Sequence, residues 1–165
     1  RKNSTGGRIF HLAGDRGVES GQWPLPNVWL GVSAEDPETY KQRMLYLSQT
    51  PAAVRFVSFE PLLGDIGDLM LDGIFEGAYQ WAIIGGESGP GARPCDLAWI
   101  RSIKEQCQAA GVKVFVKQLG AKPFEGKERR YPEPMNVKFP LNLEDKKGGD
   151  IREFPEDLRV REFPC

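Results

Sequence analysis

The chain has 165 residues, of which 40% are hydrophobic, and its formal net charge at pH 7 is -1. That length suffices for one globular domain with a sizeable core and leaves little room for a second complete domain. The near-neutral charge argues against a dedicated non-specific nucleic-acid binder, although a local basic groove stays open. The longest apolar runs, such as residues 81–84, are far too short to cross a bilayer of about 30 Å, so we expect a cytoplasmic protein without a membrane partner.

The cysteines and the histidine form no recognisable disulfide or metal pattern. The chain has three cysteines at wide spacing, Cys95, Cys107 and Cys165, which indicates neither a disulfide framework nor a CxxC metal site. We therefore expect reduced thiols. The single histidine, His11, has no partner at metal-ligand spacing and is expected at the surface.

The first predicted elements are a strand and a helix. Residues 1–26 form an irregular N-terminal segment, and residues 27–33 (NVWLGVS) are typical of a buried strand. Asp36 is a predicted helix N-cap, because a proline follows it at the first helical position. We expect this helix to end before the Thr-Pro pair at residues 50–51.

The second and third strands are predicted at residues 54–59 and 80–86. Between them, residues 64–79 contain several glycines and permit at most a short or broken helix. The third strand (QWAIIGG) is apolar on both faces, as expected for a central parallel strand with helices on one side and core on the other.

A second helix and a fourth strand complete the regular part. Asp96 is predicted to cap a helix that ends at Gly111, where a C-terminal glycine cap belongs. The fourth strand follows at residues 112–118. The helix carries one apolar stripe, formed by Leu97, Ile100, Ile103, Cys107 and Ala110.

Four strands joined by connections of roughly helical length predict a parallel α/β fold with right-handed crossovers. The pattern fits half of a TIM-like (β/α) barrel or an open doubly wound sheet, and we favour the half-barrel over residues 27–120. Residues 121–165, rich in proline, glycine and charge, are predicted to be an irregular extension. Within it, residues 137–154 could form a hairpin around residues 147–150, at an edge or as a covering loop or lid.

Polar residues gather at the predicted strand ends. In parallel α/β folds the ligand binds outside the carboxyl ends of the strands, where successive loops converge. We therefore expect three carboxylates and one lysine to face the same opening at the carboxyl ends of the strands. The candidate catalytic residues are Glu60, Glu87 and Lys117, and the candidate substrate-binding residues are Ser33, Glu35, Ser58 and Gln118.

This arrangement of charges allows several interpretations. It could hold a cationic ligand group, bind a metal, or perform general acid–base work with Lys117 paired to a glutamate. Alternatively, Glu60 and Lys117 form an ion pair that only closes the end of the barrel. Because charged residues at four consecutive strand ends are costly to keep buried without use, we favour a functional site.

The most distinctive segment is GGESGPGARP, residues 85–94. Its glycines let the backbone approach a ligand closely, and its exposed amides, with Arg93 beside them, could bind a phosphate or carboxylate. It is neither the dinucleotide GxGxxG fingerprint nor a Walker loop. The alternative is a strand-to-helix turn that simply needs glycine. The candidate cofactor-binding residues are Gly85, Gly86, Glu87, Ser88 and Arg93.

Aromatic and basic residues give little support for a nucleic-acid partner. Trp29 and Trp81 lie inside predicted strands, which favours core packing over base stacking. Residues 129–131 (Arg-Arg-Tyr) could touch a nucleic acid, but neighbouring glutamates cancel most of their field, so a solvated loop is favoured. Nucleic-acid binding stays an open alternative.

Four longer motifs lie within residues 25–120: NVWLGVSAED, TPAAVRFVSFEPLLGDI, WAIIGGESGPGARPCDLAWIRSIKEQC and FVKQLG. Together they resemble a phage-associated bacterial family of undetermined function. Complete members resemble radical S-adenosylmethionine proteins, whose N-terminal half carries a three-cysteine cluster suited to a [4Fe-4S] centre. The resemblance implies S-adenosylmethionine and a [4Fe-4S] cluster as cofactors of the complete protein, and a three-Cys-motif partner protein.

This chain departs from that pattern, because the cysteine cluster and the first barrel strands are absent from it. Its cysteines do not replace the missing ligands, which lie on one loop at short spacing, so we expect this chain alone to hold neither cofactor. The Gly-Gly-Glu triplet at 85–87 resembles the motif that holds the methionine amino group in radical enzymes, but it stands at a late strand rather than the second. Leu119 replaces the family's usual tryptophan.

Three functional hypotheses follow. The leading one is the C-terminal half of a radical-type enzyme barrel, which supplies binding residues at its strand ends. The second is a non-catalytic phage-associated interaction module that pairs with a partner chain, the missing N-terminal half, or a second copy to cover its open sheet edges. The third is a divalent-metal hydrolase or nuclease that uses Glu35, Glu60 and Glu87.

Overall fold

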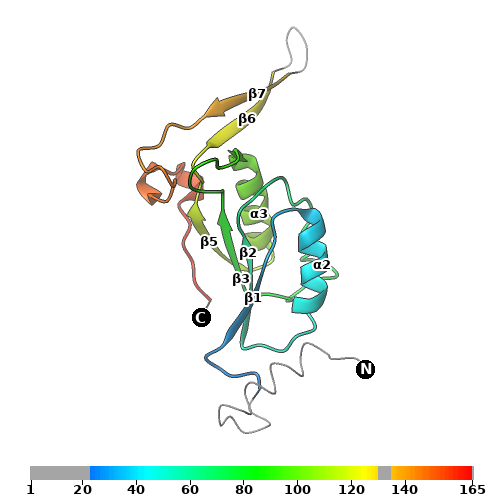
Figure 1. Ribbon diagram of the computed structural model, residues 1–165. Helices are drawn as coiled ribbons and strands as arrows, with labels where there is room; N and C mark the ends of the chain where they lie inside the picture. The colour runs from blue at the N-terminus through cyan, green and yellow to red at the C-terminus, as the bar shows by residue number, and fades with distance from the viewer. Residues whose placement is uncertain (1–22, 130–134, 165) are drawn as a thin grey trace.

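The computed structural model describes residues 23–129 and 135–164. Predictions on residues 1–22, His11 among them, and on 130–134 and Cys165 lie outside the described residues. The described part has a mixed α/β architecture with a four-stranded sheet, two α-helices and a smaller three-stranded sheet (Figure 1).

The larger sheet is parallel throughout, with strand order β1–β2–β3–β5. All four predicted strands are confirmed, with small differences at their ends. Because the strand order follows the chain order, right-handed crossovers place every connecting helix on the same face. The strands are β1 (Trp29–Ser33), β2 (Val54–Phe59), β3 (Trp81–Gly85) and β5 (Lys113–Gln118).

Helix α2 (Pro37–Leu47) begins where the sequence predicts it. A carboxylate oxygen of Asp36 accepts a hydrogen bond from the backbone N–H of Thr39 at 2.8 Å, and the Thr39 hydroxyl accepts one from the Asp36 N–H at 3.2 Å. This reciprocal pair is a capping box that satisfies two donors at the helix start. Tyr40, Met44 and Leu47 are buried, so the predicted apolar spacing faces the core.

Helix α3 (Leu97–Ala109) is capped by Asp96, whose carboxylate accepts a hydrogen bond from Ala98 N–H at 2.9 Å. The predicted apolar stripe is buried except for its last member, Ala110, which is exposed beyond the helix end. Gly111 has a φ of +73°, the left-handed conformation that the predicted glycine cap requires. Within the described residues, no helix is long and apolar enough to span a membrane.

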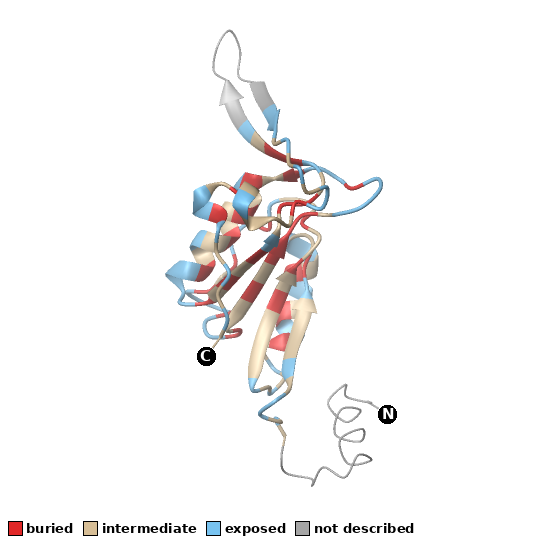
Figure 2. Cartoon of the chain, turned by 90° about the vertical axis from the view of Figure 1, so that its left-hand side faces the viewer, coloured by how far each residue is buried: buried red, intermediate tan, exposed pale blue. Residues whose placement is uncertain are grey.

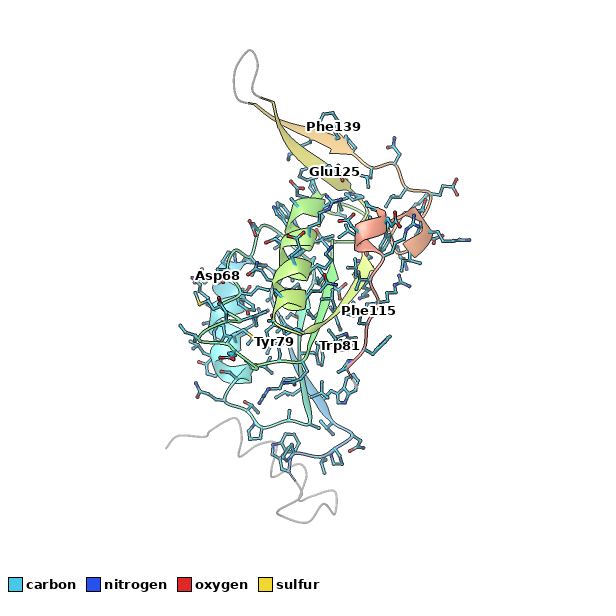
Figure 3. All side chains as sticks on the ribbon, turned by 180° about the vertical axis from the view of Figure 1, so that it is seen from behind. Asp68, Tyr79, Trp81, Phe115, Glu125 and Phe139 are labelled. Atoms are coloured by element: carbon cyan, nitrogen blue, oxygen red, sulfur yellow. The ribbon has the colours of Figure 1, made fainter. Side chains whose placement is uncertain are left out.

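The core lies between the helices and one face of the sheet. Figure 3, seen from behind, shows α2 and α3 in front of the strands. Alternate strand residues point to this face and have no exposed surface, as the period of two in a strand requires. They are Val57, Phe59, Ala82, Ile84, Val114 and Val116.

The opposite face of the sheet has no helix on it within the described residues. Strand residues there are only partly buried, and Figure 2 shows the strands in alternating buried and intermediate segments. Trp81 lies at the centre, with the rings of Trp29 at 5.7 Å and Phe56 at 5.8 Å. Trp29 is 43% exposed, so its predicted place in the core is wrong: it stands on the outermost strand, at the uncovered face.

The outer edge of β5 is covered by the C-terminal segment. Val116 N–H donates to the carbonyl of Val160 at 2.8 Å, and Glu162 N–H donates to the carbonyl of Val114 at 2.8 Å. On the β1 side, Arg43 donates to the carbonyl of Ser33 at 2.8 Å. Strand edges invite further pairing, and these contacts limit it.

The residues after β5 contain more regular structure than predicted. β4 (Cys95–Asp96), β6 (Pro123–Arg129) and β7 (Met135–Pro140) form the smaller sheet, in which β6 and β7 are antiparallel. Figure 1 shows it beyond the end of the larger sheet where β3 and β5 terminate.

The hairpin predicted for residues 137–154 is wrong, because residues 145–149 close on themselves. The Asp145 carboxylate accepts hydrogen bonds from the backbone N–H groups of Lys147 and Gly149.

Two short 3-10 helices follow that turn, at Ile151–Glu153 and Glu156–Leu158. Phe154 and Leu158 are buried in the main core, so this segment packs on the body of the protein. Between β2 and β3, where the sequence permits at most a short or broken helix, the structure has turns and no helix. The backbone of this segment is bound to α3, because the side-chain carbonyl of Gln106 accepts a hydrogen bond from Leu69 N–H at 2.8 Å.

Candidate functional site

The ends of three adjacent strands surround one pocket of about 230 Å³. The pocket lies at the carboxyl edge of the sheet, where ligands bind in parallel α/β folds. It brings together most of the charged residues that the sequence singled out at strand ends. It is lined by Glu60 and Pro61 after β2, by Gly86, Glu87 and Ser88 after β3, and by Lys117 and Gln118 at the end of β5.

Glu60 is the most buried carboxylate of the pocket, with 16% of its side chain exposed. One oxygen, Oε2, accepts hydrogen bonds from the Ser58 hydroxyl and from Nζ of Lys117, both at 3.2 Å. The other, Oε1, is buried without a hydrogen-bond partner among the described residues. A buried unpaired oxygen is costly, and such a group in a native structure points to a function or to an unseen partner.

The position of Glu60 depends on Gly85. A β-carbon on Gly85 would lie 2.5 Å from Oε1 of Glu60 and 3.1 Å from Cγ of Gln118. Glycine therefore lets the carboxylate lie directly against the end of β3. On the other side, Gln118 donates from its side-chain amide to the carbonyl of Gly86 at 2.7 Å.

Glu87 and Arg93 form a bidentate ion pair at the pocket mouth. Arg93 donates from Nε at 2.7 Å, from Nη2 at 2.9 Å and from its backbone N–H at 2.9 Å. These hydrogen bonds lower the pKa of Glu87 from 4.5 to about 2, so the carboxylate is ionised at neutral pH. The pair closes the loop at residues 88–92, and the predicted anion-binding guanidinium already has a carboxylate as its partner.

The first strand does not contribute to the pocket. Glu35 pairs with Arg43, whose Nη1 lies 2.9 Å from Oε2, and Ser33 is bound through its carbonyl to the same guanidinium. The three predicted glutamates thus each have their own cation, Arg43, Lys117 or Arg93. Among the side chains that the structure describes, no group of three or more His, Cys, Asp or Glu residues could hold a metal ion.

Most of the chain matches one known protein family. Residues 4–147 match a family described as "Protein of unknown function (DUF5131)". The chain belongs to this family. No curated protein and no solved structure matches the chain.

The family match spans every residue that lines the pocket of this DUF5131 protein. It ends within the turn at residues 145–149, before the segment that pairs with β5. The pocket therefore belongs to the part of the chain that carries the family's sequence pattern.

The two described cysteines of the DUF5131 chain do not fit an iron–sulfur cluster. Cys95 and Cys107 are buried, and burial raises the pKa of each thiol to about 12. Cluster ligands are thiolates, and a [4Fe-4S] centre needs at least three of them close together. Cys95 lies behind the pocket wall, since a β-carbon on Gly86 would be 2.9 Å from its Cβ. Both cysteines are packing residues.

Sequence reasoning missed the support of the pocket from the C-terminal segment. Leu119 N–H donates to the carbonyl of Gly148 at 2.7 Å, directly behind Gln118. From the sequence, the Gly-Gly pair at 148–149 indicates only a hairpin turn. A long-range backbone contact of this kind leaves no periodic signal in a sequence.

Proposed function

We propose that the strand-end pocket binds a small ligand with a cationic hydrogen-bond donor, within a radical S-adenosylmethionine-like enzyme of which this chain supplies the C-terminal part. The observation that carries the proposal is the Glu60 carboxylate, with one oxygen bound to Ser58 and Lys117 and the other buried and unpaired. An ammonium group of a ligand would satisfy that oxygen once the side chain rotates it away from Gly85, against which it lies.

The half-barrel is part of the same proposal. In a (β/α) barrel all helices lie outside, whereas a doubly wound sheet has helices on both faces. Here α2 and α3 pack on one face, and the strand order follows the chain order. The helix-free face carries aromatic side chains around Trp81, which Phe163 of the C-terminal segment covers in part, and the polar side chains of Ser58 and Lys117 next to the pocket. A barrel interior likewise has packed layers and a polar mouth.

Each pocket residue has a distinct task in this proposal. Glu60 holds the cationic group, Lys117 balances the second charge of a zwitterionic ligand, and Gln118 fixes the wall through Gly86. The volume of about 230 Å³ is below the roughly 300 to 1,000 Å³ of pockets for drug-sized ligands. It suits an amino-acid-sized group, with the rest of a larger ligand outside.

S-adenosylmethionine and a [4Fe-4S] cluster would supply the radical chemistry of such an enzyme. In this proposal the ammonium group of S-adenosylmethionine would pair with Glu60 and its carboxylate with Lys117. The cluster does not fit the described cysteines, so its ligands would lie elsewhere in the full-length protein.

The test is the iron and labile-sulfide content of the full-length gene product, purified without oxygen, together with its EPR spectrum. A reducible [4Fe-4S] signal that S-adenosylmethionine perturbs is the expected result. A well-folded full-length protein without iron would remove the radical-enzyme proposal.

The helix-free aromatic face, which Phe163 of the C-terminal segment covers only in part, favours one second candidate, an interaction module. Four strands spaced by about 4.8 Å and five residues of about 3.3 Å each give a face of roughly 300 Å². A stable interface buries about 800 Å² per partner, so a partner on this face must also cover neighbouring surface. Sedimentation analysis decides this candidate. A dimer or a complex with the three-Cys-motif partner supports it, and a dispersed monomer that binds no partner contradicts it.

A further inference from the structure

Three glycines from separate segments pack backbone to backbone behind the pocket. Gly86 follows β3, Gly120 follows β5, and Gly148 lies in the turn at residues 145–149. A β-carbon on Gly148 would overlap the carbonyl oxygen of Gly120, and one on Gly120 would lie 2.9 Å from the carbonyl carbon of Gly86. Any side chain at Gly120 or Gly148 would therefore push the three segments apart, because packed interiors leave no room for an added methyl group.

Backbone hydrogen bonds join the same three segments. Leu119 N–H donates to the carbonyl of Gly148 at 2.7 Å, and Ala121 N–H donates to the carbonyl of Glu87 at 2.8 Å. Gly86 N–H donates to the carbonyl of Gln118 at 3.2 Å. The turn, the end of β5 and the loop after β3 thus form one continuous layer.

Arg161 fastens this layer to the sheet. Its Nη2 donates to the carbonyl of Gly149 at 2.9 Å and to that of Lys117 at 3.3 Å. One side chain therefore ties the turn to the strand end that carries the pocket lysine. Its guanidinium also lies over the ring of Phe115, with 5.4 Å between its carbon and the ring centroid.

We infer that Gly148 and Arg161 are positioning residues of the strand-end pocket. The turn at residues 145–149 sets the separation of the loops after β3 and β5, and that separation sets the distance between Gly86 and Gln118 in the pocket wall. Neither Gly148 nor Arg161 lines the pocket. The inference rests on the proposed function only for the identity of the ligand.

The test compares Gly148→Ala with Gly111→Ala in the 165-residue chain. Both glycines have a left-handed φ, +65° and +73°, so both variants carry a similar backbone cost. A β-carbon on Gly111 meets no atom within 4 Å, which makes it the matched control. The first readout is the NMR spectrum, in which the Gly86 backbone amide and the Gln118 side-chain amide report on the pocket wall.

The second readout is the S-adenosylmethionine concentration that half-perturbs the EPR signal of the full-length protein. Gly148→Ala should shift both pocket resonances and raise that concentration by about tenfold or more, since small displacements in a site weaken binding strongly. Gly111→Ala should change neither readout. Unchanged resonances in a folded Gly148→Ala chain, or equal shifts in both variants, overturn the inference.

Arg161→Gln provides a second variant if Gly148→Ala does not fold. It removes the hydrogen bonds to the carbonyls of Gly149, Lys117 and Val116 without adding a β-carbon, and it should shift the same two resonances. Arg152→Gln is its control, because Arg152 is 86% exposed and pairs with Asp150 on the surface. Pocket resonances that stay at their original chemical shifts in Arg161→Gln contradict the inference. Absence of an S-adenosylmethionine effect in the unaltered protein removes the proposed function and leaves the NMR comparison intact.

Discussion

Replacing Glu60 with glutamine should remove ligand binding while leaving the free energy of unfolding nearly unchanged. The substitution keeps the shape of the side chain and removes its charge. Lys117, the partner at 3.2 Å, is 55% exposed and remains hydrated when the charge is lost. Ion pairs with an exposed member contribute about 0 to 1 kcal/mol.

A second effect opposes this loss. Oε1 of Glu60 is buried without a partner, and an unsatisfied buried group costs roughly 1 to 3 kcal/mol, more when charged. Replacing the carboxylate with a neutral amide reduces that cost. The two effects nearly cancel, so Glu60→Gln should change stability by no more than about 1 kcal/mol, or about 2–4 °C in Tm for a chain of this size.

The assay is urea unfolding followed by tryptophan fluorescence. The control is Glu35→Gln, which breaks the ion pair with Arg43 at the same edge but outside the pocket. The control should lose up to about 1 kcal/mol and retain ligand binding. A loss above about 3 kcal/mol in Glu60→Gln would instead mark the Glu60–Lys117 contact as a structural buried ion pair, because that is the cost of breaking one.

Three further predictions concern the pKa values and the exposed ring. Carbon-13 NMR of the side-chain carboxyl should give Glu87 a pKa of about 2. Since this lies below its ordinary 4.5, Glu87 adds stability above pH 4.5 that is lost as pH falls toward 2. Arg93→Gln should reduce both effects without abolishing them, because the backbone N–H of residue 93 still donates to the carboxylate. In a Cys165→Ser variant, Ellman's reagent should modify Cys95 and Cys107 only after unfolding, because both thiols are buried with pKa values raised to about 12; rapid labelling of the folded chain contradicts this. Trp29→Phe should reduce the quenching of tryptophan fluorescence by acrylamide, since Trp29 is 43% exposed, and unchanged quenching would place that ring under cover.

Elements with strong local signals were predictable from the sequence. The Asp-Pro start of α2, the Asp96 cap of α3 and the glycine at 111 are chemical signals that act within a few residues. The four strands were equally clear, because apolar runs between such signals have few alternatives.

Long-range contacts were not predictable in the same way. The turn at residues 145–149 looks like a hairpin turn by composition, yet its carboxylate–amide bonds close it locally and its backbone packs against Gly120. Likewise, Trp29 has the residue type of a core position. Only the absence of helices from that face of the sheet, within the described residues, leaves it exposed.

The sequence predicts which residues gather at the strand ends, but not which carboxylate pairs with which cation. Topology brings Glu60, Glu87 and Lys117 to one edge, as parallel strands require. Which cation each carboxylate takes depends on helix and loop positions that no short motif encodes. Glu35, for example, pairs with Arg43 and does not line the pocket.

The most direct test of the central claim is the EPR spectrum of the full-length, anaerobically purified protein, recorded with and without S-adenosylmethionine for the unaltered sequence and for Glu60→Gln. We expect a reducible [4Fe-4S] signal in both, perturbed by S-adenosylmethionine at a much lower concentration in the unaltered protein. An S-adenosylmethionine effect that is identical in Glu60→Gln, or a folded protein without a cluster, would contradict it.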